Sequence, residues 1–188
     1  MLKLRKLLYL LKNNVLCSLL FGLVASANAG DASKPPISIP FQLAKIGAVY
    51  TFQVHVIEQL TYAINIYFYL TLPNKWPHFL DNESPEEERR LGIILGGARK
   101  TESSKWIEPG VPAKFRVQII QNETGKHVLD ELVERLETNP AYMGRYATLA
   151  TKNLPIGLYT ISVEYIYGAP ELAPLYAKIS FARAHHGK

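Results

Sequence analysis

The chain has 188 residues with 21 basic and 16 acidic side chains, a length that suits one ordinary domain. Four of the basic residues lie within the first 29 positions, so the remainder carries 17 basic against 16 acidic side chains. This nearly neutral balance excludes a charge-based argument for nucleic-acid binding.

Residues 1–29 have the pattern of a secretory signal peptide. A basic start (Lys3, Arg5, Lys6, Lys12) precedes a ten-residue apolar run at 15–24, which is too short to span a bilayer comfortably. Ala27-Asn28-Ala29 supplies the small residues of a cleavage site. We therefore predict a periplasmic or secreted bacterial protein without stable membrane insertion after cleavage; an uncleaved N-terminal anchor is the alternative.

The single cysteine, Cys17, lies inside this apolar run and follows Leu16, whereas a lipoprotein signal has a small residue before its cysteine. After cleavage no cysteine is left, so we expect no disulfide, no thiolate nucleophile and no cysteine-ligated metal. The hydrophobic core alone must then hold the domain, and its size is sufficient for that.

Beyond a polar and flexible lead-in at residues 30–36, alternation of apolar and polar residues predicts a series of β-strands. They are expected at 37–41, 48–58, 62–71, 113–120, 145–149, 154–167 and 175–184, before a polar tail at 185–188. The short connection between 48–58 and 62–71 favours antiparallel neighbours. The apolar residues of 127–137 fit both the alternation of a strand and the spacing of a helix. We expect a short strand that runs into a helical turn.

The strand at 154–167 has the clearest alternation in the chain. A turn at Pro155 and Gly157 is followed by Tyr159, in the position where immunoglobulin-like sandwiches use a tyrosine to fix a corner. The strand must pair with, and pack against, sheets formed by the other segments.

Residues 72–105 interrupt the strand pattern as an insertion. Ser84 as N-cap, Pro85 at the first helical position and Glu87 closing a capping box predict a helix that Gly96-Gly97 ends. Leu91, Ile94 and Leu95 would face inward, and a polar loop and a turn would follow. We expect the sandwich to fold even without this insertion.

About seven strands in sequence, without βα alternation, predict an all-β fold over residues 37–184. The expected architecture is an antiparallel immunoglobulin-like β-sandwich with one short helical insertion.

Four short motifs occur in order along the chain: KPPISIPF at 34–41, WIEPGVP at 106–112, LPIGLY at 154–159 and APEL at 169–172. In this order the chain resembles an uncharacterised family of secreted or lipid-anchored bacterial domains, known only as a domain of unknown function. The resemblance implies an immunoglobulin-like β-sandwich and supplies no catalytic residues. The chain departs from the lipoprotein members by lacking their lipid-attachment motif.

The sequence carries no pattern that predicts chemistry. The histidines outside the tail lie too far apart to form a metal-binding motif, and no serine lies in a Gly-x-Ser-x-Gly elbow. Asp130, Glu131 and Glu134 could be acids of a glycoside hydrolase, but nothing sets their separation. We expect no cofactor, no metal and no enzymatic activity.

Exposed aromatic and arginine side chains are the candidate binding residues, because such residues favour interfaces. The candidates are Tyr67, Tyr69, Trp76, Arg89, Arg90 and Trp106. One hypothesis is a non-enzymatic domain that recognises another cell-envelope protein, such as an immunity protein that neutralises a toxin. The alternative is a module that binds carbohydrate or another envelope polymer by stacking on Tyr and Trp. A further alternative is that the insertion folds over the sheet and these aromatic rings form a second small core.

Overall fold

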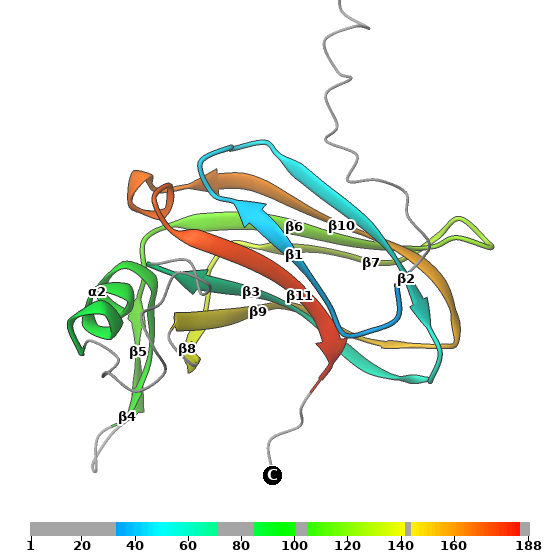
Figure 1. Ribbon diagram of the computed structural model, residues 1–188, viewed down its shortest axis with the longest axis horizontal. Helices are drawn as coiled ribbons and strands as arrows, with labels where there is room; N and C mark the ends of the chain where they lie inside the picture. The colour runs from blue at the N-terminus through cyan, green and yellow to red at the C-terminus, as the bar shows by residue number, and fades with distance from the viewer. Residues whose placement is uncertain (1–32, 71–84, 101–104, 142–143, 185–188) are drawn as a thin grey trace, which may run out of the picture.

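The computed structural model describes residues 33–70, 85–100, 105–141 and 144–184, which form a sandwich of two antiparallel sheets (Figure 1). The five-stranded sheet has the order β1 (Ile37–Gln42), β11 (Tyr176–Arg183), β3 (Leu60–Tyr69), β9 (Gly144–Leu154), β8 (Thr138–Ala141). The four-stranded sheet has the order β2 (Val49–Val56), β10 (Gly157–Gly168), β6 (Ala113–Gln121), β7 (Lys126–Val133). The described residues thus confirm the predicted β-sandwich, with more strands than the seven expected.

The core lies between the two sheets because each strand turns alternate side chains inward. In β10 the buried residues are Tyr159, Ile161, Val163 and Tyr165, which is the alternation read from the sequence. Phe115 of β6 packs against Tyr165 with ring centroids 5.1 Å apart. Burial of apolar side chains of this size contributes about 1.5–3 kcal/mol each, so this layer provides much of the stability.

Two short crossovers carry the chain from one sheet to the other at the same end of the sandwich. One joins β2 to β3 and the other joins β9 to β10, where Gly157 pairs with Val56. The expectation that β2 and β3 are paired neighbours is therefore wrong. A three-residue link can either join paired strands of one sheet or cross to the other sheet. The alternation of apolar and polar residues along the two strands is the same in both arrangements.

A tyrosine hydroxyl fixes each crossover. The Tyr159 hydroxyl donates a hydrogen bond to the carbonyl of Pro155 at 3.0 Å, and the Tyr62 hydroxyl donates to the carbonyl of Glu58, also at 3.0 Å. Both tyrosines are buried and both reach back four residues. The corner predicted at Tyr159 is present, and a second corner of the same form is found at Tyr62.

Residues 127–137 contain no helical turn. Lys126–Val133 forms β7, which pairs with β6 through a register shift between Ile119 and Ile120, and the chain then leads to β8. The helical spacing of apolar residues is misleading because Leu132 is 52% exposed on the outer surface and does not belong to the core.

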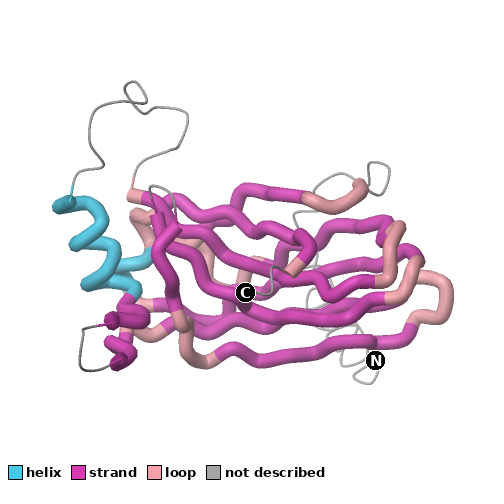
Figure 2. Tube along the Cα trace, turned by 90° about the horizontal axis from the view of Figure 1, so that it is seen from below, coloured by secondary structure: helices cyan, strands magenta, loops and turns pink. Residues whose placement is uncertain are grey.

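The insertion closes the end of the sandwich opposite the crossovers (Figure 2). Helix α2 (Pro85–Leu95) starts and ends where predicted, and Leu91 and Leu95 are buried in the main core while Ile94 is partly buried against it. The polar loop and turn expected after it are partly wrong, because β4 (Gly96–Lys100) and β5 (Lys105–Pro109) form a hairpin. Since its leucines belong to the core, we now expect removal of the insertion to destabilise the domain.

A buried arginine connects this hairpin to the five-stranded sheet. Arg145 of β9 donates from Nε to the hydroxyl of Thr138 at 3.0 Å, and that hydroxyl donates to the carbonyl of Gly96 at 2.6 Å. A Cβ atom at Gly97, which has a φ of 133°, would collide with the Arg145 guanidinium and the Thr138 carbonyl. The glycine therefore permits both the left-handed backbone and the close approach of the arginine.

Removing either corner hydroxyl should destabilise the domain without changing the fold. We expect Tyr159→Phe and Tyr62→Phe each to lower the free energy of unfolding by about 1 kcal/mol, because each removes one part-buried hydrogen bond from a hydroxyl to the backbone. Urea unfolding followed by tryptophan fluorescence measures this. Tyr176→Phe, at a tyrosine that is 42% exposed, is the control; an equal loss in the control would contradict a specific role for the corners.

Alkaline pH should weaken the fold through Tyr165. Burial raises the pKa of the Tyr165 phenol from 10.0 to about 12. The unfolded chain then releases this proton at lower pH than the folded one, so stability present below about pH 10 is lost as the pH rises towards about 12. We expect the urea midpoint to fall between about pH 8 and about pH 11, and to fall less in Tyr165→Phe. An identical fall in both proteins would contradict this assignment.

The Thr138 hydroxyl should be needed to hold the hairpin. Thr138→Val keeps the shape of the side chain but leaves Arg145 Nε and the Gly96 carbonyl without this partner, so we expect a loss of about 1–3 kcal/mol. Hydrogen exchange should also become faster in β4 and β5 than in β10. Thr148→Val, which changes an exposed threonine of the same sheet, is the matched control, and uniform acceleration of exchange would contradict a local role.

Candidate functional site

Tyrosine side chains gather on the outer surface of the five-stranded sheet. Tyr67 of β3 is directly opposite Tyr146 of β9 on one side and Lys178 of β11 on the other. Tyr69 is opposite Tyr176 of β11. We call these five residues the tyrosine face.

The centre of the tyrosine face is an aromatic pair. The rings of Tyr67 and Tyr146 are 5.6 Å apart between centroids and inclined by 27°, and both residues are partly exposed. The Lys178 ammonium lies 5.1 Å from the Tyr67 centroid and 5.5 Å from the Tyr69 centroid, in the range of cation–π attraction. The lysine and the rings therefore hold one another in place.

Tyr69 belongs to the tyrosine face but is buried, so its ring is not available to a partner. Its side chain is only 6% exposed, although the sequence placed it among the exposed candidates. Gly144 of β9 lies beside it, and a Cβ atom there would meet the ring and the Phe68 carbonyl. The absence of a side chain at Gly144 lets the Tyr69 ring lie close to the sheet.

Uncharged polar side chains surround the aromatic pair. The Thr148 hydroxyl donates a hydrogen bond to the Asn65 amide oxygen at 2.7 Å. These two residues are opposite each other, and each is the next outward-facing residue on its strand beside Tyr146 or Tyr67. Asn139 of β8 is opposite Tyr146, and Pro40 of β1 is opposite Lys178. Alternation along the described strands of this sheet places no carboxylate on the outer surface.

The outer surface of the four-stranded sheet is different, because it carries paired charges. Arg116 donates to both carboxylate oxygens of Asp130 at 2.8 Å, and Lys114 pairs with Glu134 at 2.8 Å. The hydrogen bond from Arg116, together with one from Gln118, lowers the pKa of Asp130 to about 2. Asp130 is thus a paired, ionised surface carboxylate, an environment unlike that of a general acid in hydrolysis.

Local environment also affects the central tyrosine. Burial of its ring, followed by the neighbouring Tyr69, raises the pKa of the Tyr67 phenol, and Lys178 only partly opposes this. The phenol therefore remains a neutral hydrogen-bond donor at physiological pH. The tyrosine face offers hydroxyl groups, ring surface and one positive charge.

The other predicted residues lie away from the sheet surface or outside the described residues. Arg89 and Arg90 are exposed on α2, at the end of the sandwich, as predicted. Trp106 is in β5 and pairs through its backbone with Arg99, so the hairpin carries it. Trp76 lies outside the described residues, so its role as an exposed binding residue stays a prediction.

Within residues 33–70, 85–100, 105–141 and 144–184, no three His, Cys, Asp or Glu side chains come close enough to form a metal site. No helix of these segments is long and apolar enough to cross a membrane.

Sequence reasoning missed Tyr146, Tyr176 and Lys178 as parts of the site. The alternation of β11 places Tyr176 and Lys178 on one side of the strand, which was a readable signal. Their position beside Tyr67 and Tyr69 depends on the pairing of β11 with β3, more than 100 residues apart in the chain. No local pattern specifies that register.

Comparison with solved structures supports the fold. A crystallised protein from Sulfurospirillum deleyianum superposes with a TM-score of 0.58 at 18% identity, covering 80% of this chain and 98% of that protein. The insecticidal delta-endotoxin Cry8Ea1 of Bacillus thuringiensis gives a TM-score of 0.32 at 8% identity, covering 80% of this chain and 20% of the toxin. At this level of identity, the first likeness shows a shared fold alone, and no argument rests on the second.

No curated protein sequence matches the chain significantly. The profile of one family, described as a domain of unknown function (DUF5625), matches residues 38–183. This span starts inside β1 and ends with β11, so it includes both sheets and the insertion between them. The chain therefore belongs to the DUF5625 family.

Proposed function

We propose that this chain is a non-enzymatic binding domain of the periplasm, or of the secreted fraction, that recognises a protein partner through the tyrosine face. The observation that carries the proposal is a partly exposed pair, Tyr67 and Tyr146, set among hydroxyl and amide groups without a carboxylate on the described strands. The signal-peptide pattern of residues 1–29 supports the compartment.

The composition of the face favours a protein partner. Tyrosine supplies contact area at small entropic cost, and serine, threonine and asparagine supply adaptable hydrogen bonds, which is the composition of antibody paratopes. Interface centres are also depleted in charged residues. Tyr67, Tyr146 and the neighbouring Asn65 and Thr148 have this character, whereas the opposite sheet surface has Arg116 and Asp130.

The sheet scaffold also prepares these side chains for binding. Tyr67 lies on the middle strand of five, and its ring is held between Tyr146 and Lys178. A partner then orders few side chains on contact, which reduces the entropic cost of association. With no described carboxylate on this surface, Lys178 would favour an acidic group of the partner.

An immunity-type protein that neutralises a toxin in the periplasm is one specific form of this proposal. Such a role needs a stable, exported domain with a rigid binding surface. A second candidate is a carbohydrate-binding module, which the partial exposure of the Tyr67 and Tyr146 rings favours. Sugar rings stack on flat aromatic surfaces, and the Asn65 and Thr148 side chains would bond to their hydroxyl groups.

Truncating either member of the aromatic pair should weaken partner recognition. We expect Tyr67→Ala and Tyr146→Ala each to weaken binding by at least about tenfold, because central tyrosines are typical hot spots. The measurement is quantitative pull-down from an envelope extract, followed by calorimetry with the purified partner.

Tyr167→Ala is the matched control, since Tyr167 is 50% exposed but belongs to the four-stranded sheet. Loss of the partner in this control, with retention in Tyr67→Ala, would contradict the proposal. If no protein is retained but peptidoglycan or polysaccharide is, and only the Tyr67 and Tyr146 variants lose it, the carbohydrate candidate replaces the protein one.

A further inference from the structure

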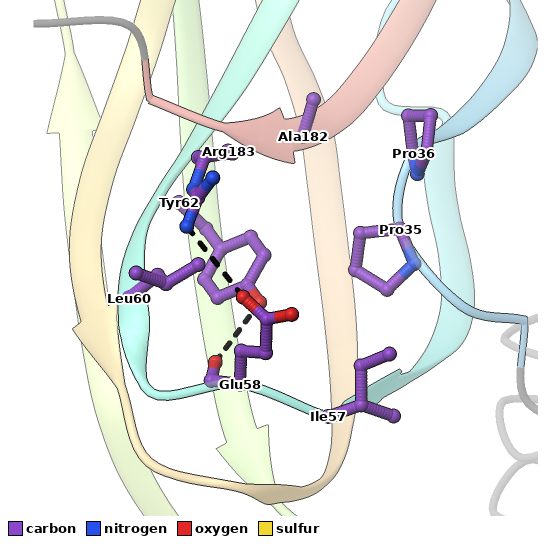
Figure 3. Close-up of a pocket in the computed structure, with 8 residues that line it drawn as sticks. All are labelled: Pro35, Pro36, Ile57, Glu58, Leu60, Tyr62, Ala182 and Arg183. Carbon is purple, nitrogen blue, oxygen red and sulfur yellow. Dashed lines mark hydrogen bonds and ion pairs between the residues drawn. The ribbon is translucent and has the colours of Figure 1, made fainter.

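A pocket of about 310 Å³ opens at the crossover end of the sandwich, at the opposite end of β3 from Tyr67 and Tyr69. It is small for a ligand pocket, since drug-sized molecules occupy about 300–1,000 Å³. Figure 3 shows Glu58 and Arg183 facing each other on one side, with Pro35 and Ile57 on the other. The pocket therefore combines one negative charge, one positive charge and an apolar wall.

The two charges form a loose pair that leaves bonding capacity for a ligand. Arg183 Nη2 lies 3.5 Å from Glu58 Oε2, and the two side chains are 61% and 64% exposed. Charge-assisted hydrogen bonds are shorter, at about 2.7–2.9 Å. Because exposed pairs stabilise a protein little, the carboxylate and the guanidinium lose little by turning to a ligand.

The backbone under both charges is nevertheless fixed. The Tyr62 hydroxyl holds the carbonyl of Glu58 at 3.0 Å, and the Tyr62 ring stacks on Phe181 with centroids 5.0 Å apart and planes inclined by 8°. Arg183 is paired with Tyr62 across β11 and β3, and the Ala184 amide donates to the Thr61 carbonyl at 2.9 Å. The site is preorganised at its base, which lowers the cost of binding.

The apolar wall is also held in place. The His55 amide donates to the Ser33 carbonyl at 3.0 Å, which ties the segment before β1 to the edge of β2 and brings Pro35 and Pro36 to the pocket. On the same side of the pocket, Ile57 is 45% exposed on the crossover. A ligand side chain that covered Ile57 and the proline rings would remove apolar surface from water.

We infer that this pocket binds an α-amino acid that has an apolar side chain. The ligand carboxylate would accept hydrogen bonds from the Arg183 guanidinium, and the ligand ammonium would donate to Glu58. The two charges of the ligand and those of Arg183 and Glu58 would then alternate in sign, so that each charge has only opposite charges as its neighbours. The side chain of the ligand would lie against Pro35 and Ile57. This inference is independent of the proposed function, because it shares no residue with the tyrosine face.

The test is an NMR titration of the purified protein with L-leucine. We expect the amide signals of Ile57, Glu58 and Arg183 to shift in a saturable manner, while those of Tyr146 and Lys178 stay unchanged. Two analogues each lack one charge: 4-methylpentanoate has no ammonium and 3-methylbutylamine has no carboxylate. Each should bind about tenfold more weakly, since a charge-assisted bond is lost.

Substitutions at the pocket should reproduce this pattern. Arg183→Gln and Glu58→Gln should each weaken leucine binding by about tenfold. Lys114→Gln and Glu134→Gln are the matched controls, because they change an exposed ion pair on the other sheet. Tyr67→Ala should also leave leucine binding intact, which separates this test from that of the proposed function.

Three results would overturn the inference. The first is that the pocket amide signals do not shift at leucine concentrations up to about 50 mM. Any dissociation constant would then lie far above the millimolar values that small ligands reach. The second is equal binding of leucine and both analogues, which would mean that the charges take no part. The third is an equal effect of the Lys114→Gln control.

Discussion

The hydrogen bond from a tyrosine hydroxyl to a carbonyl four residues earlier is the constraint on which this sandwich depends. It occurs twice, from Tyr159 to Pro155 and from Tyr62 to Glu58. Each bond closes a short crossover, and each crossover fixes the position at which a strand enters its sheet. β3 and β10 are interior strands that start at these corners, so the two corners set where an interior strand of each sheet begins.

Much of the fold was predictable because it rests on local chemistry. The period of two in residues 154–167 identifies β10 and its buried face, and the Pro-Gly turn before Tyr159 predicts the corner. Pro85 and the Gly96-Gly97 pair mark the two ends of α2. Proline is favoured at the first position of a helix, and a glycine with positive φ is favoured just after the last. In these cases the residue itself restricts the backbone.

The errors arose where the answer depends on residues distant in the chain. β2 cannot pair with β3 because β11 and β9 occupy both sides of β3, and no residue in the link between β2 and β3 encodes that. Leu132 has helical spacing with its neighbours but lies on the surface of an edge strand. The candidate site shows the same limit, since Tyr67 was predictable from alternation while Tyr146 and Lys178 join it only through pairing.

The two ends and the two faces of the sandwich differ in burial and in charge pairing. Helix α2 and the β4–β5 hairpin close one end with buried leucines and with Arg145, so this end is part of the core. Among the described residues, no helix or hairpin covers the crossover end. The ion pair of Glu58 and Arg183 and the side chain of Ile57 are therefore exposed to solvent there. The paired charges of the four-stranded sheet satisfy one another, whereas the tyrosine face keeps hydroxyl groups, ring surface and Lys178 open to a partner. Interface centres are depleted in charged residues, which is why we propose the five-stranded sheet as the recognition surface.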